Sequence, residues 1–157
     1  MNKIPMTASG FEKLQNELKL LVNKERPEII AAIAEARTHG DLSENAEYQY
    51  AKEQQSLNEG KIAELETTIA NAEIIDVSKL SGKEIKFGAT VKIKEEKSGE
   101  QSIYQIVGEY ESDIENKKIS INSPLARSLI GKTKNEIVEV NSPKGLSTYK
   151  VISIKFY

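Results

Sequence analysis

Apolar residues in the first half of the chain are spaced as on one side of an α-helix. The intervals alternate between three and four residues, which is typical of a coiled-coil seam. The early seam positions are Phe11, Leu14, Leu18 and Leu21. Thr7 precedes this run and is a suitable N-cap, so we predict a helix from there to about Thr38. Pro27 lies inside the predicted helix and should kink it or open one of its turns.

A second helix is predicted from about Leu42 to Ile75. Its seam is apolar at the base and becomes smaller or more polar toward the preceding bend. The seam positions are Ile62, Leu65, Ile69 and Ala72, and, followed backwards, Asn58, Gln55, Ala51 and Tyr48. Gly40 can end the first helix and Asp41 can begin the second. Because short connections join antiparallel neighbours, we expect an intramolecular hairpin. A helix of about 30 residues is about 45 Å long, so the bend should project well beyond a small domain.

Helical periodicity stops near Asp76, and short β-branched or alternating runs follow it. Strands are predicted over residues 90–94, 103–107, 118–121, 137–140 and 149–156, with turn-forming residues at 98–99 and 141–145. A short helix should run from Pro124 to Ile130 and end at Gly131. The predicted fold class is therefore α+β. Residues 1–78 should form an antiparallel α-helical coiled-coil hairpin, and residues 79–157 a globular antiparallel β domain with one short helix.

Charge is distributed unevenly between these two parts. Residues 1–78 hold 8 basic and 14 acidic residues, whereas residues 79–157 hold 14 basic and 10 acidic residues, so the net charges of −6 and +4 add up to −2. Neither part is basic enough for tight binding to a phosphate backbone. The chain has no cysteine, which excludes disulfides and thiolate metal sites. It shows neither a signal sequence nor a membrane-spanning run, so we expect a cytoplasmic protein without a membrane partner. Because the helices are expected to pair within one chain, we also expect a monomer.

Asp41 and Glu44 at the predicted bend are the main candidates for chemistry, and they allow two interpretations. Asp-x-x-Glu at the start of a helix is typical of a capping box, and the spacing alone favours that structural role. Alternatively, residues three apart on a helix share a face and could jointly hold a divalent cation. Magnesium keeps several waters and takes its other ligands from phosphates or a partner, so another molecule would have to complete such a site.

The other polar and aromatic residues near the bend indicate a function less specifically than the two acids do. Arg37 and Lys52 could meet phosphates, although exposed basic residues on helices are usually only solvated. Tyr48 could pack in the seam or direct its hydroxyl at whatever the tip contacts. The single histidine, His39, excludes a multi-histidine metal site and fits a solvated turn.

Several segments together resemble the Gre family of transcript-cleavage factors, which act in transcription elongation. At the bend they are RPEIIAAIAEAR (26–37), HGDL (39–42) and ENAEY (44–48); elsewhere they are IPMT (4–7), FGATV (87–91) and NSPLARSLIGK (122–132). The match covers essentially the whole chain in order. The extended basic patch of the GreB branch is not apparent, which favours the GreA branch and short cleavage products.

This resemblance implies an FKBP-like fold for the globular domain and a defined partner, bacterial RNA polymerase. The globular domain would hold the rim of the secondary channel while the hairpin enters it. The tip would then reach the active centre, with the nascent RNA 3′ end and the DNA of the elongation complex nearby. The factor would stimulate the polymerase's own cleavage of backtracked RNA and would not itself be an enzyme. It would hold no cofactor in isolation.

The resemblance also assigns roles to individual residues. Asp41 and Glu44 match the two acids with which the family helps to retain a second Mg²⁺ and to position water within the polymerase active centre. Supporting contacts to polymerase or RNA would come from Arg37, Tyr48 and Lys52 at the tip and from Ser123 and Pro124 in the globular domain.

The residues alone do not exclude two other classes of function. An adaptor could use the acidic hairpin only to bind or block the polymerase channel, and it would not need the Asp41/Glu44 pair. A freestanding nuclease or prolyl isomerase would act without polymerase, but an FKBP-like fold by itself does not imply isomerase activity.

Overall fold

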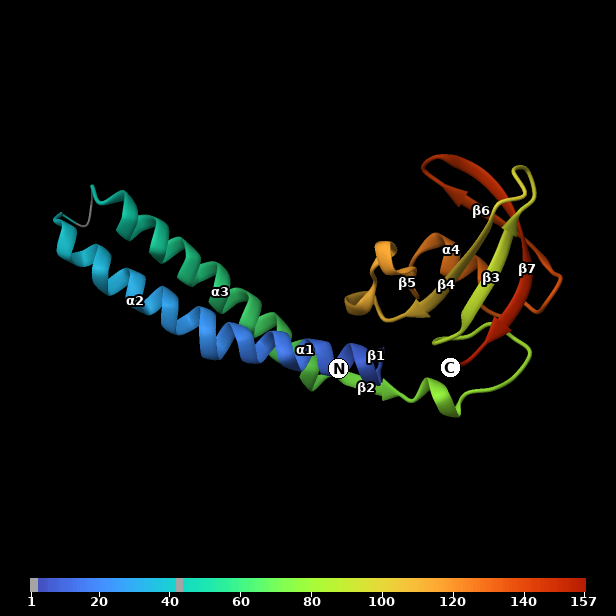
Figure 1. Cartoon of the computed structure of the whole chain (residues 1–157), viewed down its shortest axis with the longest axis horizontal. Coiled ribbons are helices and arrows are strands. Elements are labelled where there is room, and N and C mark those ends of the chain that lie inside the picture. Colours follow the sequence, from blue (N-terminus) through green and yellow to red (C-terminus); the bar gives the residue numbers. More distant parts are fainter. Residues whose placement is uncertain (1–2, 42–43) are drawn as a thin grey trace. The chain divides into compact units, whose positions relative to one another are not determined.

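The computed structural model describes residues 3–41 and 44–157. Contacts divide these residues into two compact units, one of residues 11–72 and the other of residues 3–10 together with 73–157. The first unit is a helical hairpin, and the second is a curled β-sheet with a short helix (Figure 1). The α+β fold class is confirmed, while the domain boundary between residues 78 and 79 stays a prediction. Among the described residues, no helix has the length and apolar character needed to cross a membrane.

The first arm of the hairpin begins at the predicted cap. The hydroxyl oxygen of Thr7 accepts a hydrogen bond from the Gly10 N–H at 3.1 Å, which satisfies one of the unpaired donors of the first turn. The arm consists of α1 (Ala8–Leu20), a π-helical turn (Leu21–Glu25), α2 (Arg26–Ala36) and a 3₁₀ turn (Arg37–His39). The second arm, α3 (Ala46–Ala70), returns beside α2 (Figure 1).

Pro27 opens a turn of the first arm, as predicted. Proline lacks an N–H, and its ring would clash with the carbonyl four residues earlier. The turn before it is π-helical, and the Arg26 N–H bonds to the Leu21 carbonyl five residues back. The same carbonyl accepts a hydrogen bond at 3.3 Å from the side-chain amide of Asn58, which is buried in the seam of α3. A buried polar contact of this kind specifies the register of two helices.

The predicted seam is largely buried, but the second arm is shorter than its periodicity suggested. Leu14, Leu21, Ala51, Asn58, Ile62 and Leu65 are all buried seam positions. However, α3 ends at Ala70 rather than near Ile75, and residues 72–75 form strand β2 (Ala72–Ile75), which pairs with β1 (Ile4–Thr7). The pattern of a short apolar run is compatible with a helix and with a strand. Residues 72–75 form a strand because they pair with β1, which is distant in the sequence.

The sheet of the second unit has the order β5-β4-β3-β7-β6. Its strands are β3 (Thr90–Glu95), β4 (Gln101–Val107), β5 (Lys118–Ser120), β6 (Ile137–Ser142) and β7 (Gly145–Lys155), each overlapping a predicted strand. The neighbours pair antiparallel except β4 and β5, which are parallel. The sheet is therefore mixed, and the expectation of a purely antiparallel sheet is wrong in this respect. Parallel pairing requires a longer connection than a hairpin, and residues 108–117 with their two 3₁₀ turns supply it.

The short helix α4 (Pro124–Leu129) closes the core of this unit. Ser123 caps it, because the Ser123 hydroxyl oxygen accepts a hydrogen bond from the Ala126 N–H at 3.2 Å. Ala126 and Leu129 then face the sheet, and both are fully buried. The other core side chains come mainly from alternate strand positions and are Ile85, Ala89, Val91, Ile93, Ile106, Ile119, Val138, Val140 and Val151.

Candidate functional site

The bend of the hairpin carries the candidate site. The first arm ends in the 3₁₀ turn 37–39, and Gly40 follows with φ 121° and ψ −148°. A residue with a side chain would be strained in that conformation, so Gly40 ends the arm as predicted. Asp41 comes next and is exposed. Leu42, at which we predicted the second helix to begin, lies outside the described residues.

Asn45, rather than Asp41, is the N-cap of α3. The side-chain oxygen of Asn45 accepts a hydrogen bond from the Tyr48 N–H at 3.1 Å. The amide of Asn45 donates to the Ala36 carbonyl at 2.6 Å and so ties the start of α3 to the end of α2. A carboxylate could not make this second bond, because it has no donor. Asp41 is therefore not the N-cap of α3, as the capping-box interpretation required.

This correction changes how the positions of Asp41 and Glu44 are interpreted. Asp41 and Glu44 both precede α3 and are both exposed, so they do not share a helix face as i, i+3 neighbours. The structure nevertheless brings them to one shallow hollow at the bend. The hollow is lined by His39, Asp41, Glu44, Asn45, Ala46 and Glu47. Both carboxylates are thus presented to a common space while Asn45 performs the capping.

The described side chains at the tip could not form a complete metal site by themselves. Carboxylate oxygens are the ligands that Mg²⁺ prefers, so Asp41 and Glu44 fit this ion chemically. Within the described ranges 3–41 and 44–157, however, no three His, Cys, Asp or Glu residues lie close enough together to hold a metal ion. Further ligands would have to come from another molecule.

Two of the predicted supporting residues are brought together beside the acids. The guanidinium carbon of Arg37 lies 6.0 Å from the centre of the Tyr48 ring, at the outer limit of a cation–π contact. Lys52 lies one turn further along α3, where its ammonium donates to the Gln55 side-chain oxygen at 2.9 Å. Ser123 and Pro124 belong to the other unit, at the start of α4. The roles of these residues in binding stay predictions.

Sequence reasoning missed Asn45, although a signal for it existed. Asparagine is among the best N-cap residues, and Asn45 immediately precedes the run that becomes α3. The Asp-x-x-Glu spacing that starts at Asp41 matches the capping-box motif, and for that reason it favours Asp41 over Asn45 as the predicted N-cap.

Removing the Asn45 side chain should loosen the tip. We expect Asn45→Ala to lower the free energy of unfolding of the hairpin by about 1–2 kcal/mol, because the cap and the bond to Ala36 are lost together. Asn45→Asp should cost less, because aspartate keeps the capping oxygen and loses only the donor. Urea unfolding followed by far-UV circular dichroism measures both changes. Equal stability of the wild type and Asn45→Ala would contradict this role.

Comparisons with known proteins identify the family. Residues 4–74 match the N-terminal family model described as "Transcription elongation factor, N-terminal", and residues 80–156 match "Transcription elongation factor, GreA/GreB, C-term". The chain is 60% identical over 156 residues to "Transcription elongation factor GreA" of Brucella anthropi and of Brucella canis, and the match covers 99% of each chain. GreA factor homolog 1 of Thermus thermophilus, a solved structure, is 25% identical, with a TM-score of 0.45 over 98% of this chain and 99% of that one. The chain therefore belongs to the GreA/GreB family of transcription elongation factors.

Proposed function

We propose that the chain binds bacterial RNA polymerase through its secondary channel and stimulates the polymerase's own cleavage of backtracked nascent RNA. The observation that carries this proposal is the exposure of Asp41 and Glu44 in one hollow at the end of a helical hairpin. Membership of an elongation-factor family supports polymerase as the partner. In this role the chain is a factor that lends side chains to another enzyme and is not an enzyme itself.

The tip residues suit this task through their position. Asp41 and Glu44 would bind an Mg²⁺ whose remaining ligands come from polymerase and from the RNA phosphate. Such an ion, when bound, lowers the pKa of a water and stabilises the charge that develops on the phosphate. The two carboxylates would also orient the water through hydrogen bonds. The Asn45 bond to Ala36 would keep them at a fixed place on the hairpin.

The other predicted residues would support docking. Arg37, held near the Tyr48 ring, could pair with an RNA phosphate. Lys52 could do the same from the next turn of α3. In the globular unit, exposed Pro124 and half-buried Ser123 would form part of the contact that grips polymerase at the channel rim.

A cleavage assay on arrested complexes tests the proposal. Elongation complexes that are backtracked and carry 5′-labelled RNA would be incubated with Mg²⁺, with and without the full chain. We expect the chain to shorten the labelled RNA and to let it be extended again when nucleotides are added. Free RNA of the same sequence should stay intact, which distinguishes a polymerase factor from a freestanding nuclease. Binding to the complex without shortening of the RNA would indicate a channel-blocking adaptor instead.

A further inference from the structure

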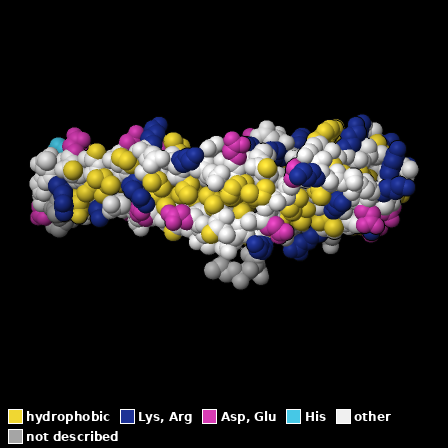
Figure 2. Space-filling view, turned by 90° about the horizontal axis from the view of Figure 1, so that it is seen from below, with side chains coloured by type: hydrophobic (Ala, Val, Ile, Leu, Met, Phe, Trp, Pro, Cys, Tyr) yellow, Lys and Arg dark blue, Asp and Glu magenta, His cyan; other side chains and the backbone are white. Residues whose placement is uncertain are grey.

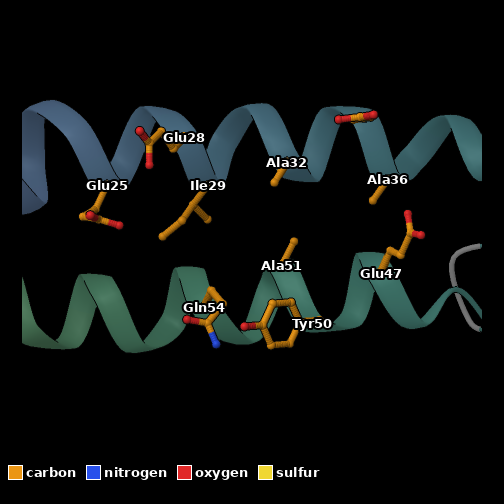
Figure 3. A pocket seen from close by; sticks show the side chains of 10 residues that line it. Glu25, Glu28, Ile29, Ala32, Ala36, Glu47, Tyr50, Ala51 and Gln54 are labelled. Carbon is orange, nitrogen blue, oxygen red and sulfur yellow. The ribbon is translucent and has the colours of Figure 1, made fainter.

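Beside the hollow that holds both tip acids, the hairpin has a second hollow, which shares Glu47 with the first. It is formed between α2 and α3, has a volume of about 390 Å³, and is named here the α2–α3 groove. Figure 3 shows Ile29, Ala32 and Ala36 of α2 pointing toward α3, and Ala51 pointing back toward α2. Because three of these four side chains are alanines, they leave space between the helices that larger residues would have filled. The floor of the groove is therefore apolar.

The rim of the groove is acidic. Glu25, Glu28 and Glu35 of α2 and the turn before it, and Glu47 of α3, complete its lining together with Tyr50 and Gln54. Glu28, Glu35 and Glu47 are exposed. His39 makes a long contact with Glu47, because its Nε2 lies 3.8 Å from a Glu47 carboxylate oxygen. Among the described residues that line the groove there is no Lys or Arg.

The basic residues of this part of the chain do not line the groove. Between positions 24 and 54 they are Lys24, Arg26, Arg37 and Lys52. Arg26 makes two hydrogen bonds to Glu59, at 2.8 and 2.7 Å, and these bonds hold the pKa of the Glu59 carboxyl below its usual value. Arg37 lies over the Tyr48 ring, and Lys52 bonds to Gln55. The negative charge around the groove is therefore not balanced by cations that line it.

Aromatic and aliphatic surface extends the apolar floor. Tyr50 is 63% exposed at the edge of the groove, and Leu57, two turns further along α3, is 60% exposed. Figure 2 shows apolar side chains running along the surface of the hairpin with charged side chains beside them. An apolar centre with an exposed tyrosine and a charged rim is the composition of a protein–protein contact.

We propose that the α2–α3 groove is a docking site for a segment of RNA polymerase that presents an apolar side chain flanked by Lys or Arg. The proposal rests on the proposed function, because it requires that the hairpin enters polymerase. The apolar side chain would lie over Ala32 and Ala51, and the flanking cations would pair with Glu28 and Glu35. Charge complementarity of this kind steers association and fixes the register of two surfaces.

Charge reversal at the rim tests the electrostatic part. Glu28→Lys/Glu35→Lys in the full chain should weaken binding to core RNA polymerase by about tenfold, with a smaller difference at high salt. Glu53→Lys/Glu64→Lys is the matched control, because both of these glutamates are exposed on α3 and neither lines the groove. Competition binding with a fluorescent wild-type chain measures both. Equal weakening by the two pairs overturns the site and leaves only a general charge effect.

Cross-linking tests the location and the partner. The chain has no cysteine, so a single Ala32→Cys labelled with a benzophenone places one photoreactive group at the groove. Ser56→Cys, exposed on α3 and outside the groove, is the control, and His39→Cys reports on the tip. Each labelled chain would be mixed with core polymerase, irradiated and mapped by mass spectrometry. We expect Ala32→Cys to label a polymerase peptide with an apolar residue flanked by Lys or Arg, and Ser56→Cys not to label that peptide.

The tip label separates the two proposals. Labelling of polymerase from His39→Cys but not from Ala32→Cys overturns the groove and leaves the proposed function standing. Labelling of an acidic segment, of nucleic acid or of a second copy of the chain from Ala32→Cys also overturns the groove. Failure of both labels to reach polymerase overturns the proposed function and the groove with it.

Discussion

Replacing both tip acids with their amides, Asp41→Asn with Glu44→Gln, should reduce the stimulated rate of RNA cleavage by at least about 100-fold. Stabilisation by a metal ion contributes several kcal/mol to a phosphodiester transition state, and about 1.4 kcal/mol corresponds to tenfold in rate. The amides keep the size of the side chains and remove the negative charge that attracts the cation. Both residues are exposed and lie outside α3, so neither substitution should disturb packing.

The measurement is the single-turnover rate of RNA shortening in backtracked complexes, with saturating factor. Affinity for polymerase, measured separately, should change by less than about threefold, because in the proposed complex the globular unit and the sides of the hairpin also bind polymerase. A rise in Mg²⁺ concentration should recover part of the lost rate if the acids act by retaining the ion. Glu53→Gln on α3 is the control for loss of a carboxylate. Unchanged cleavage by the double variant would assign Asp41 and Glu44 no role in the chemistry.

Periodicity and capping chemistry predicted most of the fold. The seam positions, the Thr7 cap, the turn opened at Pro27 and the β segments of the second unit were all visible in local patterns. Each of these features is determined by residues within a few positions of one another. This is why an isolated sequence is sufficient to find them.

Where the prediction was wrong, a contact between distant residues decided the structure. The stretch 72–75 reads as the last turn of a helix, but β1 pairs with it and makes it a strand. At the tip, Asp41 has the better local motif, but Asn45 can both cap α3 and donate to Ala36, nine residues earlier. Asp41 and Glu44 are exposed at the bend, and the capping role that their spacing indicated belongs to Asn45.

The structural role of Glu111 could not be predicted from the sequence. It lies in the 3₁₀ turn after β4, and its carboxylate accepts hydrogen bonds from the Thr7 N–H at 3.0 and 3.1 Å, from the Thr7 hydroxyl, and from the Gly108 N–H at 2.8 Å. These bonds hold β1 and the first residues of α1 to the rest of the second unit. No local motif connects residue 7 with residue 111, so only the folded structure reveals the anchor.

Gly108→Ala should break this anchor. A methyl group at position 108 would fall far inside van der Waals contact with the Pro5 carbonyl oxygen and would also crowd the Glu111 carboxylate. The backbone of β1 has to move, because a carbonyl cannot rotate away as a side chain can. We expect the free energy of unfolding of the second unit to fall by about 2–3 kcal/mol, from overpacking and from the loss of the hydrogen bonds to Glu111. The backbone of Gly108, with φ −68°, suits any residue, so the effect is steric.

Gly60→Ala provides a control of opposite sign. Gly60 lies inside α3, and a methyl group added there would meet no described side chain or neighbouring segment within 4 Å. Alanine should therefore stabilise the hairpin by about 0.5–1 kcal/mol through helix propensity. Urea unfolding measures both variants, and amide hydrogen exchange at Thr7 reports the anchor directly. Glu111→Gln, which keeps the shape but replaces an acceptor with a donor, should increase exchange at Thr7 as Gly108→Ala does. Destabilisation by Gly108→Ala without faster exchange at Thr7 would place the damage elsewhere than at the anchor.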